Sequence, residues 1–257
     1  MIRAWLDMAP AGIFLSLMVL YFGTVALLAI LAFRSPVRRQ VHSLHGVVAP
    51  FFNAVAILFA LLASFLANDV SERSRQALRT VQAEAGELRN IHTLSVASVS
   101  DMKAIRAALK AYASSIVVDE WPAMNQFRTS PRTAAAYDNL LREVSQPGLS
   151  KASGQTVHAA IVNATVHAGT LRNVRLALAG DYTNDLKWLV VIALGLFTQL
   201  AIGLVHLDRF RAFVASLVVF SGAVVIALGI IALQEYPFEG TFQVSPAPIE
   251  TIQTLSD

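Results

Sequence analysis

Four long stretches of the chain contain no aspartate, glutamate, lysine or arginine, and they limit the possible folds more than any other feature. They are Met8–Phe33, Gln40–Asn68, Trp188–Leu207 and Ala212–Gln234, of 26, 29, 20 and 23 residues. A helix needs about 20 apolar residues to cross the hydrocarbon core of a bilayer, and only helices or closed β-barrels satisfy the backbone there. No stretch shows the alternation typical of barrel strands. The sequence therefore predicts an all-α, polytopic membrane protein with four transmembrane helices.

The segment between the second and third stretches differs in composition. Asp69–Lys187 holds 25 charged residues among 119, a density close to the ~25% of soluble domains. Apolar residues three and four apart predict amphipathic helices in this segment. They cover about residues 78–91, continuing out of the second span, then Lys103–Val118, Thr133–Val144 and Ala152–Ala179, with a break expected at residues 146–150. We therefore expect a helical bundle inserted between the second and third spans.

These patterns divide the chain into four parts. Residues 1–68 hold transmembrane helices 1 and 2, residues 69–187 the extramembrane helical module, residues 188–234 transmembrane helices 3 and 4, and residues 235–257 an acidic, proline-containing tail expected to be irregular.

Several classes of function are disfavoured. The chain has no cysteine, so disulfides, thiolate nucleophiles and cysteine-ligated metals are excluded. Its net charge is only +3 and no basic run is present, so no nucleic-acid partner is expected. No nucleophile–base set, phosphate loop or zinc signature occurs, so we predict no enzyme, no cofactor and no metal site. Arginine outnumbers lysine 16 to 4, which is typical of high-GC bacteria and favours a bacterial inner membrane.

The second span carries a row of small and polar residues on one helical face: Asn53, Ala56, Ala60, Ser64 and Asn68. Polar groups at membrane depth normally face protein or a water-filled cavity, so this row could line a pore. Small residues also let transmembrane helices approach closely, so simple helix packing is the alternative, and the sequence alone favours it.

The distribution of charged residues is compatible with two membrane topologies. Five arginines in the two short loops and the acidic tail favour short loops inside the cell, with both termini and the module outside. Arginines also flank the module next to the second and third spans, which weakens that assignment.

The chain resembles the bestrophin-like membrane domain family through several short segments in a fixed order. Glu120-Trp121-Pro122-Ala123-Met124 looks like the family signature, and a glutamate-containing helix at residues 81–88 precedes it. Tyr112 and the following Ile116-Val117-Val118 resemble the approach to the signature. Pro237-Phe238-Glu239-Gly240 and then Val244-Ser245-Pro246 resemble the end of the domain. One departure is Gln234-Glu235-Tyr236, where such sequences commonly have Leu-Asp before Pro-Phe.

The resemblance implies an ion channel. Bestrophins are pentamers whose second transmembrane helices line the pore, with phenylalanines at a constriction. By this likeness we expect a homo-oligomer, a pentamer if the likeness extends that far, with Phe52, Phe59 or Phe65 as a hydrophobic neck, and permeant ions and the lipid bilayer as partners. The family keeps its termini and module in the cytosol, opposite to the topology that the short-loop arginines favour.

Charges at the end of the second span would act as an ion filter if it is a pore. They are Asp69, Glu72, Arg73 and Arg75, and their alternating signs leave the selectivity open. The alternative function is a non-conducting receptor, scaffold or accessory subunit whose module binds a ligand or partner. A pore needs a ring of subunits, whereas a receptor bundle usually needs only a dimer.

Overall fold

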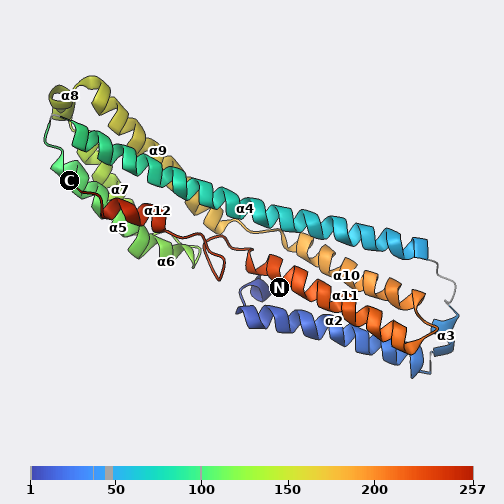
Figure 1. Cartoon of the computed structure of the whole chain (residues 1–257). Helices are drawn as coiled ribbons and strands as arrows, with labels where there is room; N and C mark the ends of the chain where they lie inside the picture. Colours follow the sequence, from blue (N-terminus) through green and yellow to red (C-terminus); the bar gives the residue numbers. More distant parts are fainter. Residues whose placement is uncertain (1, 37, 44–48, 99, 257) are drawn as a thin grey trace. The chain divides into compact units, whose positions relative to one another are not determined.

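The computed structural model describes residues 2–36, 38–43, 49–98 and 100–256 (Figure 1). Residues 44–48, which belong to the second uncharged stretch, lie outside these residues. The chain forms two compact units. The first comprises Met1–Ser71 with Tyr182–Glu235, and the second comprises Glu72–Asp181 with Tyr236–Asp257.

Four helices in the described part of the chain are long and apolar enough to cross a membrane. They are α2 (Pro10–Phe33), α4 (Ala49–Ala97), α10 (Asp185–Val205) and α11 (Phe210–Leu233). The prediction of a four-span helical membrane protein is thereby confirmed. The helix α4 runs without interruption from the second span into the module, as its apolar periodicity predicts.

The first unit is held together by α2, α10 and α11, which pack on one another (Figure 1). The first unit also contains the part of α4 up to Ser71 and two short helices, α1 (Ile2–Leu6) and α3 (Arg38–His42). The Gln199 side chain of α10 is fully buried and donates to the backbone oxygen of Tyr21 (3.0 Å) and to Ser221 Oγ (2.7 Å). One amide thus joins all three helices, because a buried polar group in an apolar bundle must find its partners there.

The second unit is a helical bundle around an apolar core. Besides the later part of α4 it contains α5 (Lys103–Ser115), η1 (Ile116–Glu120), α6 (Trp121–Met124), α7 (Pro131–Val144), α8 (Pro147–Ser153), α9 (Gln155–Gly180) and α12 (Ala247–Gln253). Of the predicted apolar face of α4, Val81, Leu88 and Ile91 are fully buried and Ala85 is buried, whereas Leu78, the first residue of the predicted face, is 43% exposed.

Two sequence expectations about irregular segments are met only in part. The helix α7 ends at Val144 and Gln146 is extended, so the expected break is present at residues 145–146, but residues 147–153 form the helix α8, because a proline at the first helical position costs no hydrogen bond and starts a helix. A second break falls at Gly154, whose φ of +85° suits glycine. The tail forms α12 after Pro246, and its Ile249 and Ile252 are fully buried, with α12 packed on α5.

Candidate pore-lining face and buried charge cluster

The predicted polar row lies mainly on the face of α4 that the rest of the chain leaves open. Asn53, Ala60, Ser64 and Asn68 are exposed, and Ala56 is half-buried. On the opposite side Leu66 and Val70 are buried within the chain. The row therefore does not serve packing within one chain.

An apolar residue sits within the polar row. Ile57 is four residues after Asn53, and 65% of its surface is exposed. At 100° per residue, Ile57 lies between the azimuths of Ser64 and Asn68.

The three phenylalanines of the expected neck occupy different sides of α4. Phe59 packs edge-on against Phe220 of α11, with ring centroids 5.8 Å apart, and Phe52 packs against the core cluster around Phe213. Phe65 is 57% exposed. Of the three phenylalanines, Phe65 is the one that is mostly exposed, and Phe52 and Phe59 are half-buried.

The charges that follow the polar row are arranged in two ion-paired groups. Lys187 Nζ lies 2.5 Å from Asp69 Oδ2. Farther along α4, Glu72 pairs with Arg75 (2.8 Å) and Arg79 (3.7 Å) on exposed side chains. Arg73 points elsewhere and donates to the backbone oxygen of Asp181 (3.4 Å).

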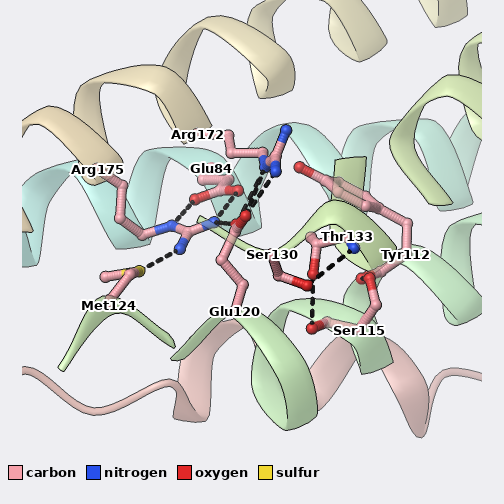
Figure 2. Close-up of polar contacts among 9 residues, drawn as sticks. All are labelled: Glu84, Tyr112, Ser115, Glu120, Met124, Ser130, Thr133, Arg172 and Arg175. Carbon is pink, nitrogen blue, oxygen red and sulfur yellow. Dashed lines mark hydrogen bonds and ion pairs between the residues drawn. The ribbon is translucent and has the colours of Figure 1, made fainter. Parts of the chain in front are cut away.

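The second unit holds a cluster of four buried charged side chains (Figure 2). Glu84, Glu120 and Arg175 are fully buried, and Arg172 is nearly so. Arg175 donates from Nε to Glu84 Oε2 (2.7 Å) and from Nη2 to Glu84 Oε1 (3.1 Å) and Glu120 Oε2 (2.9 Å). Arg172 forms a second ion pair with the Glu120 carboxylate, in which its Nη2 lies 2.5 Å from Glu120 Oε1. The cluster is neutral as a whole and joins α4, η1 and α9.

The carboxylates of the cluster favour the charged form of the Arg175 guanidinium. Burial would lower the pKa of the Arg175 guanidinium, but the carboxylates of Glu84 and Glu120 outweigh it and raise that pKa. Tyr112 lies beside these groups (Figure 2) and is buried, which raises the pKa of its hydroxyl well above 10.0. Its Oη has no hydrogen-bond partner among the residues that the structure describes.

The signature residue Glu120 reaches the charge cluster from the end of a π-helix. The residues Ile116–Glu120 form a π-helix, where the sequence predicted an α-helix to Val118. A π-turn adds a residue to the helical turn, and both Ile116 and Glu120 are thereby buried. Pro122 occupies the first turn of α6, where a missing N–H costs little.

The two family-like segments meet in the second unit. The rings of Trp121 and Phe238 pack edge-to-face at 5.6 Å, and the Arg175 guanidinium lies 5.4 Å from the Trp121 ring centroid. Pro237, which precedes Phe238, is also buried. Gly240 has a φ of +80°, a conformation that other residues rarely adopt. The segments thus form a structural support around the charge cluster.

Glu235, the acid at which the tail departs from the usual family sequence, also has defined hydrogen-bond partners. The Glu235 carboxylate is fully buried and accepts from the backbone N–H of Thr183 (2.5 Å) and from Trp188 Nε1 (3.2 Å). It ties the end of the fourth span to the start of the third.

Sequence reasoning missed Arg172 and Arg175 as partners of the signature glutamate. No local sequence pattern links the two arginines to Glu120, which lies 52 residues from Arg172 and 55 residues from Arg175. Among the described residues, no group of three or more histidine, aspartate or glutamate side chains could hold a metal ion.

The fold and these features define a four-span membrane protein with an inserted helical module, and comparison with known proteins agrees. The sequence profile of the Bestrophin-like domain family matches residues 19–249. The chain belongs to this family. No curated protein matches it in sequence.

Solved structures with a similar fold include bacterial bestrophin homologues. A mutant of the homologue from Klebsiella pneumoniae aligns with a TM-score of 0.69 and 16% identity, covering 94% of this chain and 96% of that chain. Another structure of the Klebsiella pneumoniae homologue aligns at 0.64 and 15%, covering 90% and 95%. A mutant described as a membrane protein aligns at 0.70 and 15%, covering 94% and 96%. At these identities the likeness establishes the fold.

Proposed function

We propose that the protein is a subunit of a homo-oligomeric ion channel whose pore is lined by α4. The observation that carries this proposal is the exposure of the side-chain amides of Asn53 and Asn68 on one face of an otherwise apolar span. Exposed amides in a membrane span require water or another polar surface, whereas the hydroxyl of Ser64 on the same face already donates to the backbone oxygen of Ala60 (2.8 Å). A ring of α4 helices supplies a shared aqueous axis for this row. Membership in the bestrophin-like family supports the same arrangement, with five subunits as the expected number and a bacterial inner membrane as the location.

The pore has an apolar constriction at Ile57 in this proposal. Its exposed side chain lies among the polar residues, and a ring of such side chains can close a pore to water by dewetting. Phe65 borders the same face and adds to the neck, whereas Phe52 and Phe59 pack inside the protomer.

The mouth charges favour anions weakly. Asp69 is neutralised by Lys187, and the next exposed group on α4 combines Glu72 with Arg75 and Arg79, which leaves one net positive charge per subunit. Rings of fixed charge bias the sign of the permeant ion, and exposure to salt keeps that bias small.

The test has two stages. First, the mass of the purified protein in mild detergent, corrected for bound detergent, should correspond to a ring of about five chains. Second, liposomes containing the protein should conduct small ions, and Ile57→Ala should raise the flux. A monomeric or dimeric mass would exclude a central pore and favour the receptor or accessory-subunit function. A ring without flux would leave an oligomer that does not conduct under those conditions.

A further inference from the structure

One end of the first unit carries a surplus of positive charge. It is the end at which α2 leads into α3 and α10 leads into α11 (Figure 1). Residues 34–43 and 206–211 form these two connections, and they contain five arginines: Arg34, Arg38, Arg39, Arg209 and Arg211. The same residues contain one acid, Asp208, so the five arginines leave a net charge of +4 with the histidines neutral.

The two connections meet through an aromatic contact. The rings of Phe33 at the end of α2 and Phe210 at the start of α11 pack edge-to-face, with centroids 5.1 Å apart. Arg34 follows the first ring in the chain and Arg211 follows the second. Val41 of α3 packs against the same apolar cluster as Phe33. Arginines from three helices are therefore gathered around one apolar base.

The five guanidinium groups are available to a partner from outside the chain. All five side chains are exposed, and within the described part of the chain none of them forms a hydrogen bond or an ion pair. The helix α11 also begins here without a side-chain cap from the described residues, so the positive end of its dipole adds to the charge. At the opposite end of the same unit, by contrast, Lys187 is paired with Asp69. A guanidinium binds two phosphate oxygens at once, which makes arginine a favoured phosphate partner.

The exposed apolar faces of α2 and α11 both reach this end of the unit. Leu27 and Ile30 of α2 are 54% and 52% exposed, and at 100° per residue they share a face with Arg34. On α11 the face that starts at Arg211 continues to Val218, which is 40% exposed. Exposed apolar side chains of a membrane span suit lipid acyl chains, so the arginines lie at the level of the lipid headgroups.

We propose that this end of the first unit binds anionic phospholipid, with Arg34 and Arg211 on the phosphate and the acyl chains along α2 and α11. The charge of the arginines selects an anionic headgroup over a zwitterionic one. A lipid fits better than a protein partner, because only four residues separate the end of α10 at Val205 from the start of α11 at Phe210, and little of the chain projects beyond the headgroups there. The inference goes beyond the proposed function and does not depend on ion conduction.

Lipid titration of the purified full-length protein tests the inference in detergent micelles, where the sidedness of the membrane no longer matters. Phosphatidylglycerol or phosphatidylcholine with the same acyl chains is added, and binding is followed as the rise in unfolding temperature. One basic residue near an anionic lipid surface contributes roughly a fivefold change in affinity. We therefore expect a midpoint at least about tenfold lower for phosphatidylglycerol, and Arg34→Gln/Arg211→Gln should lose most of this preference. Arg38→Gln/Arg39→Gln repeats the test on α3 if the first variant does not fold.

The matched control is Arg142→Gln/Lys151→Gln, which removes the same charge from exposed positions of the module and should keep the full preference. Equal midpoints for the two lipids, or equal losses in the control and in Arg34→Gln/Arg211→Gln, would overturn the inference. The same stabilisation by inorganic phosphate at equal concentration would assign the arginines to a free anion and not to a lipid. A changed detergent-corrected mass of Arg34→Gln/Arg211→Gln with an unchanged lipid preference would assign them to a contact between chains, which also overturns it.

Discussion

Arg175 on α9 and Glu84 on α4 form an ion pair through two hydrogen bonds, and both side chains are fully buried. Glu120 accepts a further bond from the same guanidinium and binds Arg172 on its other side. These ion pairs join the second part of α4, the helix whose first part carries the polar row, to η1 and α9 in the helical module. The family signature places Glu120 at the centre of this fastening, so we assign it a structural role.

Removing one partner of the cluster should strongly destabilise the protein. Arg175→Met leaves two buried carboxylates with only Arg172 to balance them, and breaking a buried pair costs about 3–5 kcal/mol. Thermal unfolding in detergent, followed by circular dichroism, measures the loss. The control is Glu72→Gln, which breaks an exposed pair and should cost no more than about 1 kcal/mol. Equal effects of the two variants would contradict a stabilising role for the cluster.

Two neighbouring tyrosines should respond in opposite ways to removal of the hydroxyl. The rings of Tyr112 and Tyr137 lie 5.5 Å apart. Tyr112 Oη has no hydrogen-bond partner within the described part of the chain, whereas Tyr137 Oη donates to the backbone oxygen of Thr165 (3.2 Å). Tyr112→Phe should therefore leave the free energy of unfolding unchanged or raise it, and Tyr137→Phe should lower it by about 1 kcal/mol. Denaturant titration of both variants checks the difference.

The buried hydroxyl of Tyr112 should also make the stability of the protein depend on pH. Burial raises the pKa of Tyr112 well above 10.0, so the folded protein keeps the proton where the unfolded chain loses it. The unfolded state then binds fewer protons, and stability falls as the pH rises above about 10. Tyr112→Phe should reduce this alkaline loss of stability. An identical alkaline slope in the variant would show that other groups cause it.

The spans could be predicted from the sequence because a membrane helix is defined by its own composition. The buried cluster could not. Arg175 is 91 residues from Glu84 and 55 from Glu120, and no local pattern states which charges will meet. The π-helix at residues 116–120 was missed for a related reason. Its register is set by the need to bury Glu120 against two arginines of another helix, and not by local propensity.

The polar row on α4 could be predicted from the sequence only in part. Its helical spacing identified Asn53, Ser64 and Asn68 as one face from the sequence. Whether that face packs inside the chain or points away from it depends on which side α10 and α11 cover. The mouth charges are similar, because the pairing of Asp69 with Lys187 links residues 118 apart.

Glu235 should matter for the junction between the third and fourth spans. Glu235→Ala leaves the buried Trp188 indole N–H and the Thr183 N–H without their acceptor, and an unsatisfied buried donor costs about 1–3 kcal/mol. We expect a lower unfolding temperature and altered fluorescence of Trp188. Glu235→Gln retains an acceptor oxygen and should be milder. Unchanged stability in Glu235→Ala would show that these two bonds contribute little.

A large side chain in the polar row should block conduction. Ser64→Trp places an indole on the exposed face of α4, where it would fill a pore lined by this row, and we expect flux in liposomes to fall at least tenfold without loss of the oligomer. The matched control is Val219→Trp on α11, where Val219 is 72% exposed and should face lipid. Unchanged flux in an intact Ser64→Trp oligomer would remove this face from the pore.

The charges on α4 beyond the span should set the sign of selectivity. Glu72 is shared by Arg75 and Arg79, so Glu72→Gln raises the net charge of this group from one to two positive charges per subunit. An exposed charge contributes at most about 1 kcal/mol, which corresponds to roughly a fivefold change in the anion-to-cation permeability ratio. We expect Glu72→Gln to shift the reversal potential in a salt gradient toward anions, and Arg79→Gln to shift it toward cations. Both shifts should shrink at high ionic strength, because salt screens exposed charges. Shifts of the same sign in the two variants would show that these side chains act through structure and not through their charge.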